Sequence, residues 1–124
     1  MYIKSAKDLE VYKLAYKQAM DIFFLSKDFP KEEKYSLTDQ IRRSSRSVCA
    51  NLREVWARRS YIAHFTSKLT DCDGENAETN TWIDFAKDCE YITLTDYKNL
   101  SEKNQQIGKM LGNMITKADV FCKK

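Results

Sequence analysis

Apolar residues recur every three or four positions along most of the chain, the spacing of one face of an α-helix. The clearest example is the stretch of residues 37–59, LTDQIRRSSRSVCANLREVWARR. It predicts an amphipathic helix about 35 Å long, whose buried side carries Leu37, Ile41, Ser44, Val48, Leu52 and Val55. Arg42, Arg46 and Arg53 fall together on the opposite side, at spacings of four and seven residues. We call these three residues the arginine stripe.

A first helix is predicted over residues 8–27, with Asp8 as its N-cap. Its main apolar stripe consists of Leu9, Tyr12, Tyr16, Ala19, Met20 and Phe23. Other apolar residues occupy most of the remaining circumference, so this helix needs partners on more than one side. The pattern therefore predicts contact between subunits as well as a bundle. Phe29-Pro30 ends the helix, because the residue before a proline is disfavoured in helical geometry.

The second helix opens at Ser36 and Asp39, which are spaced as a capping box. Near Ser60 it either runs on without a break or turns back in a tight corner. An unbroken helix over residues 37–91 would be about 80 Å long and hard to bury, which favours the corner with Ser60 as the next N-cap. The third helix then presents a seam of Ile62, Phe65, Leu69, Cys72, Asn76, Thr79, Ile83 and Ala86.

The fourth helix has the most regular spacing in the chain, and Thr93 and Thr95 are its candidate caps. Its seam consists of Tyr97, Leu100, Asn104, Ile107, Leu111, Met114, Ala118 and Phe121. Asn76, Thr79 and Asn104 place polar groups inside the third and fourth seams, where such residues fix register at some cost in stability. Four helices with short connections predict an all-α fold, an antiparallel up-down-up-down four-helix bundle formed by one domain of residues 1–124.

Composition supports this class. Three glycines and one proline in 124 residues are few for a protein rich in turns. No apolar run is long enough to span a membrane, and the N-terminal MYIKSAKDLE has no apolar signal core, so we expect a cytoplasmic protein without a membrane partner. The four cysteines form no C-x-x-C pair, and we expect small buried or half-buried residues rather than a zinc or redox site.

Charge is distributed unevenly around the net value of +3. Residues 37–59 carry six arginines against two acids, whereas residues 60–91 carry two lysines against seven acids. The overall balance does not indicate a nucleic-acid partner, but the local balance is compatible with one.

Several stretches resemble one family of bacterial proteins. They are LEVYKLA in the first helix, FPKEEKYSLTDQIRRSSRSVCAN across the second, WIDFAKDCEYI in the third and IGKMLGNMI in the fourth. Together they are similar to the four-helix-bundle proteins encoded in intervening sequences of 23S rRNA genes, a family related to the accessory variability protein of diversity-generating retroelements. Cys49, Arg53 and Val55 stand where the family signature has proline, alanine and glycine. The family name reflects gene location.

The resemblance implies a homo-oligomer, with a pentameric ring as one form. It also implies a role with RNA or DNA or in a reverse-transcriptase complex. From the residues themselves, the candidate nucleic-acid contacts are the arginine stripe and its neighbours Arg43, Arg58 and Arg59. Guanidinium groups bind phosphates bidentately, so a stripe of them on a helix can follow a nucleic-acid backbone. Aromatic residues interleaved for the stacking of single strands are missing from the arginine stripe.

An alternative interpretation gives the same arginines a structural role. Asp71, Glu75 and Glu78 share one side of the third helix and can face three arginines, within a subunit or across an interface. The protein would then be a protein-binding scaffold without a nucleic-acid role.

The sequence offers little for catalysis or cofactor binding. A di-iron bundle needs Glu-x-x-His motifs, and the one histidine, His64, is not part of such a motif. A dyad of His64 with Ser60 or Ser67 lacks a third member and an oxyanion hole, and we expect a surface histidine near the Asp71 side of the helix. Gly108 and Gly112 lie inside a helix and indicate close approach of a neighbouring helix rather than a phosphate loop. We therefore expect no enzyme, no metal and no cofactor.

Overall fold

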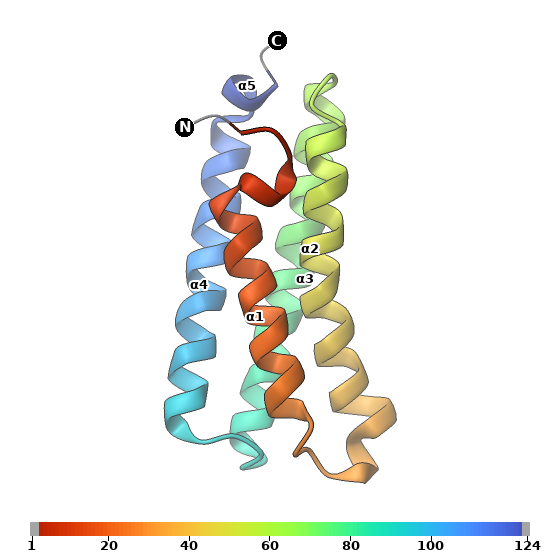
Figure 1. The fold of residues 1–124 in the computed structure, drawn as a ribbon, viewed down its shortest axis with the longest axis vertical. Coiled ribbons are helices and arrows are strands. Elements are labelled where there is room, and N and C mark those ends of the chain that lie inside the picture. Colours follow the sequence, from red (N-terminus) through yellow and green to blue (C-terminus); the bar gives the residue numbers. More distant parts are fainter. Residues whose placement is uncertain (1–2, 123–124) are drawn as a thin grey trace.

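The computed structural model describes residues 3–122, and every regular element in that range is helical. The four long helices are α1 (Glu10–Ser26), α2 (Asp39–Ala57), α3 (Ile62–Asp88) and α4 (Leu94–Thr116). They lie side by side and alternate in direction (Figure 1). Helices α1 and α3 each pack against both α2 and α4. The predicted antiparallel four-helix bundle is confirmed. No helix in the described range has the length and apolar character needed to cross a membrane.

Short helical turns complete the chain. They are η1 (Ala6–Asp8) before α1, η2 (Lys31–Glu33) and the π-helical η3 (Lys34–Thr38) before α2, and α5 (Ala118–Phe121) after α4. The chain turns back between α2 and α3, as the corner interpretation predicts, but Tyr61 rather than Ser60 occupies the N-cap position of α3.

The predicted cap at Asp8 is wrong. Asp8 belongs to η1, and Leu9 holds the N-cap position of α1. The Asp8 carboxylate instead accepts hydrogen bonds from the backbone N–H groups of Lys4 at 2.8 Å and Ser5 at 3.2 Å. These charge-assisted bonds lower the pKa of Asp8. The acid therefore stabilises the turn that precedes the helix.

The predicted capping box at Ser36 and Asp39 is also wrong, because the η3 turn leads into α2 without an extended cap residue. The Ser36 hydroxyl donates to Glu33 Oε1 at 2.7 Å. At the start of α4, Thr93 caps as predicted, since its Oγ1 accepts the backbone N–H of Asp96 at 3.0 Å. The fourth helix is shorter than expected because the chain turns at Lys117.

Helices α2, α3 and α4 bury the faces that their spacing predicts. All six positions predicted for the second helix are buried, five of them in α2 and Leu37 in η3. In α3 only Ile62, at 49% exposed, departs from the predicted seam. The seam predicted for the fourth helix extends from α4 into α5 and is buried except at its two ends, where Tyr97 and Phe121 are half-buried. The 3–4 spacing was therefore a reliable guide to the core in three of the four helices.

Helix α1 differs, and its predicted main stripe is mostly wrong. The buried side consists of Val11, Ala15, Gln18, Ala19, Ile22 and Ser26. Tyr12, Met20 and Phe23 are only half-buried, and Tyr16 is 53% exposed. The face toward the bundle thus combines alanines and a serine with two aliphatic side chains and one hydrogen-bonded glutamine. The aromatic rings consequently lie at the edge of the bundle, beside α2.

Gly108 and Gly112 do not mark a tight helix contact. A Cβ at Gly108 would lie 3.7 Å from Asn76 Nδ2, an ordinary contact distance, and one at Gly112 would meet nothing within 4 Å. The prediction of close approach at these glycines is therefore wrong.

A layer of buried polar side chains crosses the bundle and receives residues from all four helices. We call it the polar layer, and it consists of Gln18, Ser44, Asn76, Thr79 and Asn104. Asn104 Nδ2 donates to Gln18 Oε1 at 3.0 Å and to Asn76 Oδ1 at 3.1 Å, while Asn76 Nδ2 donates to the Asn104 carbonyl at 2.9 Å. Thr79 Oγ1 donates to Ser44 Oγ at 2.8 Å. Buried polar groups are thereby satisfied within the layer.

The polar layer separates two apolar clusters. The cluster on the side of the chain termini includes Phe65, Leu69 and Leu111, and the other includes Ile22, Ile41 and Ile83. Apolar contacts in either cluster are not directional, whereas the hydrogen bonds of the polar layer are. The layer therefore ties the four helices together at one height.

We expect Asn104→Ala to lower the free energy of unfolding by roughly 2–3 kcal/mol, because it leaves the buried Gln18 Oε1 without a partner and removes the nearer donor to Asn76 Oδ1. Urea denaturation followed by circular dichroism measures the change. Asn113→Ala is the matched control, since Asn113 is exposed on the same helix. Equal stability of the two variants would contradict a structural role for the layer.

A charge in the apolar cluster should be far more damaging than the same charge on the surface. Leu111 is fully buried, and its neighbour Gly112 is exposed. We expect Leu111→Asp to cost several kcal/mol, with loss of helical circular dichroism or aggregation. Gly112→Asp should keep a cooperative thermal melt. A normal melt for Leu111→Asp would mean that the α4 seam is not part of the core.

Candidate nucleic-acid interface

The arginines of α2 lie on two different sides of the helix. Residues adjacent in sequence are about 100° apart around an α-helix, so Arg42 and Arg43 point in different directions. Arg43 faces α3, where its guanidinium contacts Glu75 at 3.1 Å and Glu78 at 2.7 Å. These carboxylates raise the pKa of Arg43, with the Glu78 hydrogen bond as the largest cause. Arg43 is therefore a structural residue of the α2–α3 pair.

Arg42 and Arg46 lie on the side of α2 that faces α1. Arg42 Nε donates to the Ser26 hydroxyl at 2.7 Å. The Arg42 guanidinium lies 5.0 Å from the centre of the Phe23 ring, and that of Arg46 lies 5.7 Å from it. These are cation–π distances. Arg42 is half-buried and held in place, whereas Arg46 is exposed.

Arg53 lies two turns further along the same side. It is exposed and lines a surface hollow with Lys7, Tyr12, Lys13 and Tyr16. A second hollow joins this region to Arg46 and is lined also by Met20, Cys49 and Ala50. Arg46 and Arg53 thus line one hollowed surface between α1 and α2, which we call the groove, while Arg42 lies beside it against Phe23.

The remaining two predicted arginines lie at the corner after α2. Arg59 stacks on the Trp56 ring at 3.7 Å and donates to the Trp56 carbonyl at 2.8 Å. Arg58 is exposed in the C-cap position. The structure therefore does not gather all six arginines on one surface, since Arg43 is on another side and Arg58 and Arg59 are at one end.

The acids of α3 have partners other than the arginine stripe. Glu75 and Glu78 bind Arg43, and Lys68 lies 2.9 Å from Glu54 and 3.6 Å from Asp71. Within residues 3–122, no carboxylate lies within ion-pair distance of Arg42, Arg46 or Arg53. The scaffold interpretation allows these acids to pair with the arginine stripe inside one subunit. The structure does not contain that pairing.

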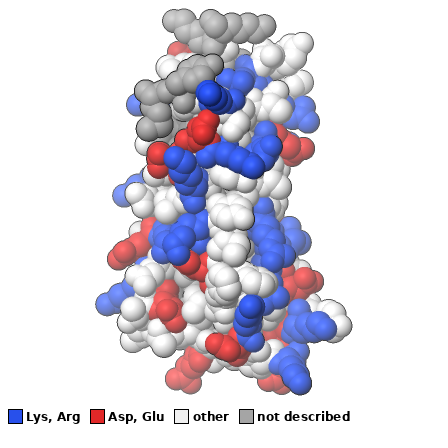
Figure 2. All heavy atoms as spheres, in the orientation of Figure 1, with Lys and Arg blue, Asp and Glu red and all other residues white. Residues whose placement is uncertain are grey.

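The face around α1 combines positive charge with uncharged surface. Figure 2 shows an uncharged strip running along this face, with Lys and Arg side chains on both sides of it. The sequence of α2 predicts the charge but not the strip, because the strip includes side chains of α1. Tyr12, Tyr16 and Met20 line the hollows beside Arg46 and Arg53, whereas the sequence pattern predicts them in the core.

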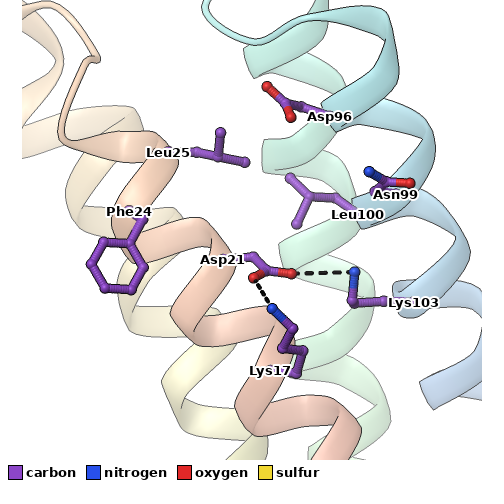
Figure 3. A pocket seen from close by; sticks show the side chains of 8 residues that line it. All are labelled: Lys17, Asp21, Phe24, Leu25, Asp96, Asn99, Leu100 and Lys103. Atoms are coloured by element: carbon purple, nitrogen blue, oxygen red, sulfur yellow. Dashed lines mark hydrogen bonds and ion pairs between the residues drawn. The ribbon is translucent and has the colours of Figure 1, made fainter.

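A different surface pocket lies between α1 and α4, and its charges are balanced. Asp21 lies between Lys17, at 2.7 Å, and Lys103, at 3.2 Å (Figure 3). Asp96 adds a second carboxylate to the lining. An anionic ligand here would compete with Asp21 for both lysines, so this pocket is a weaker phosphate site than the arginine stripe.

The residues considered for catalysis do not form a site. His64 is exposed, as predicted for a surface histidine, and the centre of its ring lies 5.5 Å from that of Tyr61. Residues 3–122 contain no group of three His, Cys, Asp or Glu side chains placed to hold a metal ion.

The cysteines are unpaired, and Cys89 is exposed, contrary to the predicted burial. Burial raises the pKa of the Cys49 thiol to about 11 and that of Cys72 to about 12. Both thiols are therefore protonated near neutral pH and poor nucleophiles.

Comparisons with known proteins identify the family to which the chain belongs. The sequence profile of the 23S rRNA-intervening sequence proteins matches residues 7–113. Among solved structures, the chain is similar to a protein of unknown function from the S23 ribosomal protein family of Bacteroides thetaiotaomicron. The two are 32% identical with a TM-score of 0.77, and the match covers 86% of this chain and 95% of the other. No match was found among curated proteins. The profile spans the four helices almost completely, and the chain therefore belongs to the family of 23S rRNA-intervening sequence proteins.

Proposed function

We propose that the protein is a non-enzymatic, homo-oligomeric bundle that binds RNA or DNA through the arginine stripe. The observation that carries the proposal is the contrast between the two sides of α2. Arg43 is bound by two carboxylates, whereas Arg46 and Arg53 are exposed, with no carboxylate of the described residues within ion-pair distance. Cations that a fold leaves in a row without counterions are suited to a polyanion.

The geometry of the stripe fits a phosphate backbone. From Arg42 to Arg53 the helix rises about 16 Å; Arg46 and Arg53 line the groove, and Arg42 lies beside it against Phe23. Arg42 is oriented in advance by its hydrogen bond to Ser26, which lowers the entropy lost when it contacts a ligand. We also propose a reverse-transcriptase complex as a setting for such binding, since the sequence resemblance to the retroelement accessory protein implies one.

The scaffold alternative now requires that the stripe pair with acids of another subunit. The same variants distinguish the two functions, because intersubunit ion pairs would make the mass of the assembly depend on Arg46 and Arg53. Binding to phosphates would leave the mass unchanged.

We expect wild-type protein to bind a labelled oligonucleotide with an affinity that falls steeply between roughly 50 and 200 mM salt. The double variant Arg46→Gln/Arg53→Gln should bind more weakly. Its log–log salt slope should be smaller by about 0.7 to 0.9 for each lost phosphate contact. Fluorescence anisotropy measures affinity and slope, and light scattering checks that the mass is unchanged.

Arg43→Gln is the matched control, because it removes one positive charge from the same helix but from the paired side. It should keep the affinity and slope of the wild type, and lower stability by about 0.5–1 kcal/mol, as expected for a half-exposed ion pair. Wild-type protein without salt-sensitive binding to RNA or DNA would refute the proposed function. A loss of mass in the double variant would favour the scaffold.

We also propose self-association through apolar surface outside the arginine stripe. Phe24 on α1 is 56% exposed and Leu94 at the start of α4 is 70% exposed. We expect light scattering at micromolar concentration to give several times the 14.6 kDa of one chain. Phe24→Ser should lower that mass, whereas Ala77→Ser, an exposed change on α3, should not. A wild type that stays monomeric would contradict this proposal.

A further inference from the structure

Aromatic side chains of α1 lie beside each part of the arginine stripe. Helices α1 and α2 are antiparallel neighbours (Figure 1). The start of α1 therefore lies beside the end of α2. Tyr12 and Tyr16 share a hollow with Arg53, and Phe23 lies against Arg42. Aromatic rings and guanidinium groups thus occur together in the groove, around Arg53, and beside it, around Arg42.

Two of these rings form a platform. The centres of the Tyr12 and Tyr16 rings are 6.2 Å apart, and their planes differ by 30°. Tyr16 is 53% exposed, while Tyr12 is half-buried. Lys7, Lys13 and Arg53 surround the hollow in which the rings lie. Lys13 has one exposed contact at 3.4 Å, with Glu10, so most of the charge around the platform is positive.

At the other end, three cations converge on one ring. Lys27 Nζ lies 4.9 Å from the centre of the Phe23 ring, and the guanidinium groups of Arg42 and Arg46 lie 5.0 and 5.7 Å from it. Within residues 3–122, none of the three has a carboxylate at ion-pair distance. Three like charges around one ring repel one another, and an anion bound beside them would relieve the repulsion.

We propose that the groove binds single-stranded nucleic acid, with a base stacked on Tyr16 and the backbone following Arg53 and Arg46 to a phosphate held by Lys27, Arg42 and Arg46. This inference rests on the proposed function and specifies its ligand. A single strand exposes the faces of its bases, which stack on aromatic rings independently of sequence. A duplex hides those faces, so its bases could not stack on the uncharged strip between the cations.

The test compares three labelled probes of equal length, an oligo-thymidine, an oligo-uridine and a DNA duplex. We expect wild-type protein to bind a single strand more tightly than the duplex. Tyr16→Ala should weaken single-strand binding roughly fivefold to a hundredfold, the effect of losing one stacked base, and leave the salt slope unchanged. The tighter of the two single strands identifies RNA or DNA as the ligand, and either supports the inference.

Phe85→Ala is the control. Phe85 is also 53% exposed, but it lies on α3, next to Trp82. The Phe85→Ala variant should bind each probe as the wild type does. Equal or tighter duplex binding that Tyr16→Ala leaves intact would overturn the inference, while the arginine stripe and the proposed function would stand. Absence of salt-sensitive binding to all three probes would overturn both. A Tyr16→Ala protein with altered mass would assign the ring to a subunit contact and overturn the single-strand inference.

Discussion

The hydrogen bonds between buried amides set the register on which the rest of the molecule depends. Gln18, Asn76 and Asn104 come from three helices, and each is satisfied only when the three side chains are at the same height. Sliding one helix by a turn would leave buried donors and acceptors unpaired, at about 1–3 kcal/mol each. The apolar clusters above and below would accept such a shift at lower cost, because hydrophobic contacts tolerate repacking.

That register decides the chemistry of the outer surface. With α1 fixed against its neighbours, its aromatic residues come to lie along the arginine side of α2, and the tyrosines reach the level of Arg53. On the other side of α2, Glu75 and Glu78 neutralise Arg43. One helix therefore has a paired side that holds the bundle together and an unpaired side that faces solvent. The proposed binding groove is a consequence of both.

The sequence predicts the bundle well and the site only in part. Periodicity suffices for α2, α3 and α4 because their inner faces are mostly apolar. It fails for α1 because burial of Gln18 depends on amides that are 58 and 86 residues away. Arg43, rather than Arg42, pairs with the acids of α3 because of how α2 is rotated about its axis. Residue spacing alone does not reveal that rotation. The aromatic side of the groove was missed because the large rings of α1 were assigned to the core.

The separation of 86 residues between Gln18 and Asn104 also has a consequence for how the chain folds. Three of the four helix contacts join neighbours in sequence, but α1 and α4 meet only by closing a loop around the whole domain. Contacts between sequence neighbours form early at small entropic cost, and long closures come later. We therefore expect the contacts between α1 and α4 to form last. The polar layer, which joins these two helices through Gln18 and Asn104, would then be complete only at the end of folding.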